Sequence, residues 1–252
     1  MDLSLATYGL LFFTGLTAGF VDSIAGGGGL IALPVLLSVG LPPQLALGTN
    51  KLQGSFGTLS ATINFIRKGK ASLKGNLLGI AYTLSGAAAG AWAIQQIQAG
   101  FIHHLIPFML LFVFVYTLMA KDLGMVQGRA KMKRHLFFMI FGLGLGFYDG
   151  FFGPGTGAFW TGALLILLGM EITSATATTR IMNFTSNVVA LTLFIIGGNV
   201  LYSVGLVMAS GQIIGARIGS GMAIKRGYTF IRPIFLTMVF LTIIRLIYVN
   251  YI

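Results

Sequence analysis

The sequence lacks cysteine entirely and is poor in charge, with five acidic residues and 8% charged residues in total. The absence of cysteine excludes disulfides, cysteine-ligated metal sites and a cysteine nucleophile. The scarcity of charge excludes an ordinary soluble domain, in which roughly a quarter of the residues are charged. Instead, 56% of the residues are hydrophobic and the mean hydropathy is +0.91. Because long apolar segments recur along the whole chain, we predict an all-α polytopic membrane protein.

The formal net charge is +11, and the lysines and arginines lie mostly in short loops between apolar segments. In a soluble chain such a charge would suggest a nucleic-acid partner, but in a membrane protein basic loops mark the cytoplasmic side. We therefore expect no nucleic-acid partner. We expect the basic loops near residues 67–74, 121–134 and 225–232 to be cytoplasmic, and both termini to be periplasmic.

The apolar segments fall into two length classes, and about eight to ten of them are expected to enter the membrane. The long segments are residues 3–21, 44–66, 77–97, 105–119, 136–151, 173–196, 200–223 and 235–252. Residues 30–39 and 158–168 are too short to cross roughly 30 Å of hydrocarbon comfortably. Glycine-rich breaks precede both, so each is predicted to be part of a broken helix or a re-entrant hairpin, and the choice between spanning and re-entering stays open.

The two halves of the chain repeat one pattern. GFVDSIAGGGG, from Gly19, matches GFYDGFFGPGTG, from Gly146, at one constant offset, and the match continues after a shift of two residues, so that Lys51 falls on Arg180. We predict a membrane repeat over residues 1–120, a basic cytoplasmic linker over 121–135 and a second membrane repeat over 136–252. The third segment ends in four basic residues in the first half but in uncharged Gly197–Asn199 in the second. Equivalent ends should therefore lie on opposite sides of the membrane, which predicts two inverted-topology repeats.

Two aspartates stand just before the glycine breaks. Asp22 precedes Gly26–Gly29, and Asp149 precedes Gly153–Gly157. A carboxylate inside the membrane needs a reason, because charge is costly there. The pair could bind a coupling proton or cation, or each aspartate could cap backbone N–H groups freed by the break.

Two cations, Lys51 and Arg180, lie well inside apolar segments in equivalent positions. An interior cation surrounded by hydrogen-bond donors suits an anion, and glycine turns let backbone N–H groups approach it. Snorkelling to a headgroup, or pairing with Asp22 and Asp149, would explain the same cations without a substrate. The neutral residues and glycines predicted to join the anion site are Thr49, Asn50, Gln53, Asn183, Asn187, Gly27, Gly28 and Gly155.

No enzyme motif is present in the sequence context that its chemistry requires. The glycine tracts are neither a dinucleotide fingerprint nor a P-loop, because no soluble strand–turn–helix unit surrounds them. His103 and His104 have no carboxylate or cysteine partner nearby in the sequence, and no Ser-His-Asp set or GxSxG motif is present. We expect no enzyme activity, no metal and no cofactor.

GFVDSIAGGGG, LALGTNKLQ, ATINFIRKG, GFYDGFFGPGTG, RIMNFTSN and GQIIGARIG resemble the sulfite exporter TauE/SafE family, and especially its branch of uncharacterised transporters of bacterial inner membranes. The resemblance covers nearly the whole chain. It implies a permease for small sulfur-containing anions such as sulfite, sulfoacetate or other organosulfonates. The implied partners are this small anion and membrane lipid, with a homo-oligomer as a further possibility.

The sequence thus favours a secondary transporter that moves a small anion by alternating access of two halves. One alternative is a proton- or cation-coupled exporter of another small metabolite, in which Asp22 and Asp149 are central. Another is a membrane scaffold that does not transport.

Overall fold

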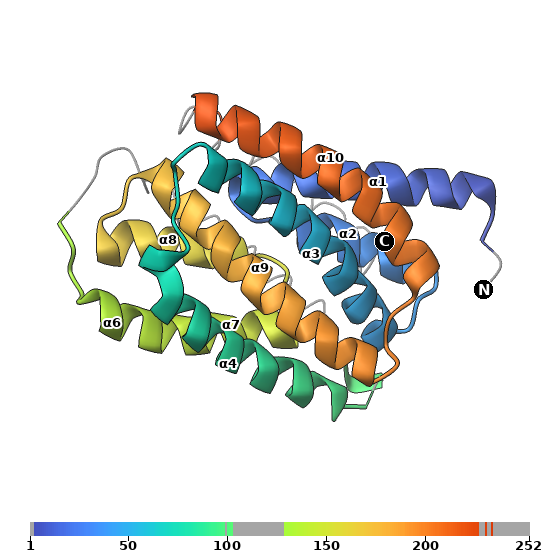
Figure 1. Ribbon diagram of the computed structural model, residues 1–252. Coiled ribbons are helices and arrows are strands. Elements are labelled where there is room, and N and C mark those ends of the chain that lie inside the picture. Colours follow the sequence, from blue (N-terminus) through green and yellow to red (C-terminus); the bar gives the residue numbers. More distant parts are fainter. Residues whose placement is uncertain (1–2, 99, 103–128, 227–229, 231–232, 234–252) are drawn as a thin grey trace.

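The computed structural model describes residues 3–98, 100–102, 129–226, 230 and 233. Within these ranges the protein is all-helical, as predicted (Figure 1). The predicted segments 105–119 and 235–252, and most of the predicted linker, lie outside the described residues. The first half contains α1 (Leu5–Ala25), α2 (Gly28–Ser38), α3 (Pro43–Arg67), a 3₁₀ turn at Lys74–Asn76 and α4 (Leu77–Gln95). The second contains α6 (Arg134–Phe137), η2 (Phe138–Gly142), α7 (Leu143–Phe151), α8 (Thr156–Leu168), α9 (Ile172–Ile196) and α10 (Tyr202–Arg226).

Helix boundaries follow local chemistry. The hydroxyl of Ser4 accepts the N–H of Thr7 at 3.2 Å and starts α1. Gly26, at φ +81°, ends the same helix in the left-handed conformation that glycine adopts most easily. The carboxylate of Glu171 starts α9 by accepting the N–H groups of Thr173 at 2.9 Å and Ser174 at 3.1 Å. Burial raises the pKa of Glu171, but these hydrogen bonds outweigh it and hold that pKa below its ordinary value.

The long helices pack in a reciprocal arrangement. Helix α1 lies along α10 and helix α7 along α4, while α3 packs on both α9 and α10, and α9 on both α3 and α4. Figure 1 shows α1 with α10 on one side, α3 and α9 crossing the middle, and α4 with α7 on the other side. Each half therefore contacts the other through its first, third and fourth helices.

Glycines make these helix contacts close. A Cβ atom on Gly215 of α10 would collide with the carbonyl oxygen of Leu16, and one on Gly86 of α4 would collide with that of Leu143. Gly86 corresponds to Gly215, and Leu16 to Leu143, in the sequence alignment of the two halves. The small-residue contacts that hold membrane helices together thus recur at matched positions.

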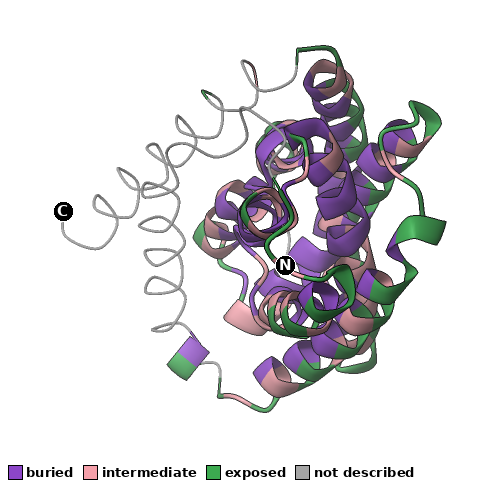
Figure 2. Ribbon diagram, turned by 90° about the vertical axis from the view of Figure 1, so that its left-hand side faces the viewer, coloured by how far each residue is buried: buried purple, intermediate pink, exposed green. Residues whose placement is uncertain are grey.

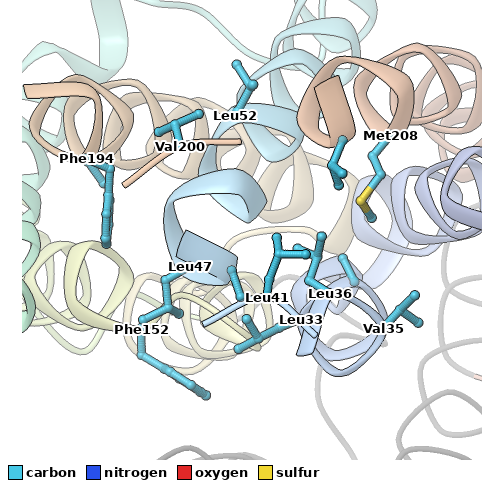
Figure 3. Packing of buried hydrophobic residues seen from close by; sticks show 14 of the residues in the cluster. Leu33, Val35, Leu36, Leu41, Leu47, Leu52, Phe152, Phe194, Val200 and Met208 are labelled. Atoms are coloured by element: carbon cyan, nitrogen blue, oxygen red, sulfur yellow. The ribbon is translucent and has the colours of Figure 1, made fainter. Parts of the chain in front are cut away.

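The two short helices are only half as long as a membrane is thick. α2 has 11 residues and α8 has 13, and 11 residues of α-helix rise roughly 16 Å, against about 30 Å of hydrocarbon. α2 packs against α1 and α3, and α8 against α9. Leu33 and Leu36 of α2 are buried in a large apolar cluster with Leu47, Phe152 and Phe194 (Figure 3).

The outward faces of the long helices are apolar. Phe13 on α1, Leu84 on α4 and Ile213 on α10 are exposed, whereas Lys51 and Arg180 of the central helices are buried. Figure 2 shows buried residues gathered between the helices and exposed ones on their outer sides. Among the described residues, α1, α9 and the run Lys74–Gln95 have the length and composition of membrane spans. Apolar side chains on the outer faces, together with charged side chains buried between the central helices, fit a lipid surrounding.

Candidate functional site

The two glycine breaks meet at the centre of the molecule. A Cβ atom on Gly157 would lie 2.5 Å from the Cα of Gly26, so only two bare glycine backbones can approach this closely. Gly29 lies beside Pro154, with 3.1 Å between its Cβ position and the proline Cα. The end of α1 and the start of α2, both from the first half, thus contact the start of α8 from the second half.

Lys51 of α3 crosses to the second half. Its Nζ donates to Oδ1 of Asp149 at 2.7 Å, to the main-chain carbonyl of Asp149, and to Oδ1 of Asn187 at 3.3 Å. The other carboxylate oxygen of Asp149 accepts the hydroxyl of Ser186. Both charged side chains are almost fully buried, at 2% and 4% exposed. The three hydrogen bonds of the ammonium group use its whole donor capacity.

Arg180 of α9 crosses in the opposite direction. Its Nη1 donates to Oδ2 of Asp22 at 3.0 Å and to the main-chain carbonyl of Asp22. Oδ1 of Asp22 accepts the N–H of Gly28 at 3.2 Å, so this aspartate also caps the start of α2. Nε and Nη2 of Arg180 are buried and have no hydrogen-bond partner within the described part of the chain. This guanidinium therefore keeps unused N–H donors in a place where buried donors are normally paired.

The pairing with Asp22 and Asp149, one of the alternatives for the two cations, is the geometry found. Each cation lies on the third helix of one half, and each aspartate lies near the end of the first helix of the other half. Two positive and two negative groups leave the centre without formal net charge, which a low-dielectric interior requires. Removing one member would leave its partner charged and buried.

A polar cavity of about 30 Å³ lies between the breaks and the two cross-pairs. Such a volume holds one or two water molecules. Its lining comes from both halves and is almost entirely polar or glycine: Asp22, Gly26, Gly29, Asn50, Lys51, Gln53, Gly54, Asp149, Gly153, Gly155, Gly157, Asn183, Asn187 and Gln212.

Most of the predicted site residues reach this cavity, and four do not. Thr49 is buried away from it, where its hydroxyl accepts the N–H of Leu201 at 3.0 Å just before α10. Gly27 and Gly28 form the start of α2 behind the lining, and Arg180 lies behind Gly157, whose Cβ position is 2.7 Å from Nη2. The predicted members that line the cavity are Asp22, Asn50, Lys51, Gln53, Asp149, Gly155, Asn183 and Asn187.

Sequence reasoning missed Ser186 and Gln212. Ser186 lies one helical turn beyond Met182 and three residues beyond Asn183, on the face of α9 that meets Asp149. Gln212 is a lone amide in the glycine-rich α10, between Gly211 and Gly215. A polar residue on a glycine-lined helix face was the available signal for Gln212, since such faces are the ones that pack inward.

Apolar outer faces, two half-length helices that meet through glycine, and a buried neutral cluster of four charges together define a polytopic helical membrane protein with a polar centre. The chain belongs to the sulfite exporter TauE/SafE family, whose model matches residues 11–246. This confirms the resemblance noted from the sequence motifs. The protein is a membrane transporter of this family and not an enzyme.

Several relatives are similar over most of their length. The chain is 41% identical to a "Probable membrane transporter protein" of Haemophilus influenzae over 98% of this chain and 97% of that protein. It is 44% identical to the "Probable membrane transporter protein YfcA" of Escherichia coli, over 89% and 84%. A Sinorhizobium protein, "Probable membrane transporter protein ORF9", is 39% identical over 98% and 94%. No solved structure gave a significant match.

Proposed function

We propose that the protein is a secondary transporter of small anions in a bacterial inner membrane, with sulfur oxyanions or organosulfonates, such as sulfite or sulfoacetate, as substrates. The observation that carries the proposal is the buried guanidinium of Arg180, in which two nitrogen atoms have no partner among the described residues and Nη2 lies behind Gly157 of the cavity wall. Arginine N–H groups match the oxygens of sulfite and sulfonate groups in charge and spacing.

The neutral amides supply the rest of the anion site in this proposal. Asn50, Asn183 and Asn187 line the cavity, and Asn187 turns its carbonyl oxygen toward Lys51 at 3.3 Å. That orientation leaves the NH₂ group of Asn187 for a ligand. Lys51 itself is fully engaged with Asp149, so an anion would reach it only by displacing one of its present partners.

The cavity size supports alternating access. A space of about 30 Å³ suits water, whereas sulfite has four non-hydrogen atoms and sulfoacetate more. The tips that meet at Gly26 and Gly157 must therefore separate for a substrate to enter. Separation toward one side and then the other is the motion expected of inverted repeats around a central site.

The matched helix contacts and the crossed ion pairs support the repeat predicted from sequence. The proposal keeps the inverted orientation, with the basic loops cytoplasmic, both termini periplasmic, and a homo-oligomer as a further prediction. Three basic residues lie at the end of α3 and just after it: Arg67, Lys68 and Lys70. By the positive-inside rule they support a cytoplasmic position for this end of the helix.

Coupling to a proton or another cation is the second candidate function. It is favoured by one observation, the partial exposure of the Asp22 side chain, which is 18% exposed and lines the cavity. In this version Asp22→Asn would abolish flux while Arg180→Lys would not. If the protein transports an anion, Arg180→Lys should reduce flux more than Asp22→Asn. A scaffold that does not transport would show no flux in the wild type either.

Proteoliposome uptake tests the proposal. Wild-type protein should take up labelled sulfite or sulfoacetate, and Arg180→Lys, which keeps the charge but removes the unpaired guanidinium nitrogens, should raise KM by about tenfold or more. Gly144→Ala is the matched control, because nothing lies within 4 Å of its Cβ position on α7. Uptake that is absent in the wild type, or unchanged in Arg180→Lys, would contradict the anion site.

A further inference from the structure

Gln212 of α10 is a buried polar residue at the wall of the cavity. It is 2% exposed and lines the cavity, and neither end of its carboxamide makes a hydrogen bond to any described residue. Side-chain amides inside proteins are normally hydrogen-bonded to protein or to water, and this cavity is large enough for water. A polar group held unpaired at the wall of a cavity is placed for a ligand.

Two glycines make room for this side chain. A Cβ atom on Gly57 of α3 would collide with Oε1 of Gln212, and one on Gly19 of α1 would lie 2.7 Å from the same oxygen. Both neighbouring helices therefore lack a side chain where the carboxamide passes between them. Since Oε1 is the carboxamide atom that lies close to both glycines, the NH₂ group is the end that this proposal assigns to a ligand in the cavity.

The equivalent contact between the halves, that of α4 with α9, is built differently. In the alignment of the halves Gln212 corresponds to Thr83, and Gly57 to Ser186. Thr83 lies outside the cavity lining, with its hydroxyl 3.5 Å from the sulfur of Met182. Ser186 fills the space that Gly57 leaves open, and its hydroxyl is bound to Asp149. The α4–α9 contact thus has a short threonine and a serine that binds Asp149, while the α3–α10 contact has a glycine and a long amide that lines the cavity.

We propose that Gln212 is a substrate-contacting residue, whose amide N–H donates to an oxygen of the transported sulfite or sulfonate group. The proposal rests on the proposed function and names a contact on α10 that sequence motifs did not indicate. A neutral donor adds no charge to a centre whose formal charges already cancel. It therefore strengthens binding of the anion without making its release as slow as an added positive charge would. A site that hydrogen-bonds a substrate oxygen also discriminates against anions without an oxygen at that position.

Transport kinetics of matched variants test this contact. Gln212→Leu keeps the volume but removes the donor, and it should raise KM for sulfite and sulfoacetate roughly tenfold with little change in maximal rate. Gln212→Glu replaces the donor with a carboxylate oxygen and should raise KM further, because it repels the anion. Thr83→Val, at the equivalent position of α4, should leave KM unchanged.

A second pair of measurements separates contact from packing. The melting temperature of Gln212→Leu without substrate should match that of the wild type, while its stabilisation by added sulfite should be reduced. The double variant Gly57→Ser/Gln212→Thr reproduces the residue pair that the equivalent α4–α9 contact already contains. If Gln212→Leu does not fold, this double variant decides the question, with the same expected rise in KM.

The outcomes distinguish the two proposals. An unchanged KM in a folded Gln212→Leu or double variant, beside normal wild-type uptake, overturns the contact alone. A lower melting temperature and maximal rate at unchanged KM also overturn it, because they indicate a purely structural side chain. If wild-type protein neither takes up nor is stabilised by sulfite or sulfoacetate, the proposed function fails and the contact fails with it.

Discussion

The Lys51–Asp149 and Arg180–Asp22 pairs occupy equivalent places in the two halves, yet their surroundings differ. Lys51 uses all its donors, and Asp149 is 4% exposed with a serine hydroxyl on its second oxygen. Within the described parts of the chain Arg180 leaves two nitrogen atoms unpaired, and its partner Asp22 is 18% exposed. We propose a division of labour between the pairs: the satisfied lysine pair holds the two halves together, and the arginine pair binds the anion.

The largest effect should come from breaking the two pairs separately. Lys51→Ala leaves Asp149 charged and buried, and should lower the free energy of unfolding by about 3–5 kcal/mol. Arg180→Ala should cost less, because Asp22 is more exposed and keeps the N–H of Gly28. Thermal unfolding in detergent measures both. The double variant Lys51→Ala/Asp149→Ala should recover part of the loss, and equal losses in the two single variants would remove the distinction.

Ser186→Ala should weaken only the lysine side. The variant deprives the Asp149 carboxylate of a hydrogen bond, and bonds to charged groups contribute about 1.5–3 kcal/mol. The melting temperature should fall, while KM for the anion should stay the same because Ser186 does not line the cavity. Ser85→Ala is the matched control, since that hydroxyl bonds the carbonyl of Ala81 on an exposed face. A raised KM in Ser186→Ala would place the lysine pair in binding as well.

Gly157→Ala tests the meeting of the two breaks on the arginine side. The added methyl group would lie 2.5 Å from Gly26 and 2.7 Å from Nη2 of Arg180. Overpacking of this kind costs typically about 1–3 kcal/mol, and the displaced guanidinium should also slow uptake. Unchanged unfolding and uptake would mean that the tips are not in contact in the working protein.

The smallest effect concerns the start of α9, the helix that carries Arg180. The pKa of Glu171 is held below its ordinary value by its capping bonds, so its charged form stabilises the folded state at neutral pH. This stabilisation should be lost as the pH falls from the ordinary glutamate value through the lower pKa of the folded protein. The melting temperature of Glu171→Gln should therefore lie slightly below that of the wild type at neutral pH and converge with it in acid. A gap that persists in acid would contradict this assignment.

Much of this centre was open to sequence reasoning. Charged residues in apolar segments are so unfavourable that Asp22, Lys51, Asp149 and Arg180 stood out without coordinates. The half-length segments and the glycine breaks followed from hydrophobic length alone. The position of Thr49 did not, because neighbouring residues on one helix face different partners, and a one-residue step along α3 separates the hydroxyl that binds Leu201 from the amide of Asn50 at the cavity.

The sequence by itself determined that this is a helical membrane protein with a repeated pattern of charge and glycine. Polar groups are costly in lipid, so a membrane protein has few charged residues and long apolar segments, and both features can be seen in the sequence. Tertiary structure alone decided that each cation pairs with the aspartate of the other half. It also decided that Arg180 keeps nitrogen atoms without a partner among the described residues, and that Gln212 lines the cavity while Thr83 does not. Those outcomes depend on how closely helices approach across the two halves. That distance is set by which glycines face which backbone, a property that local periodicity does not encode.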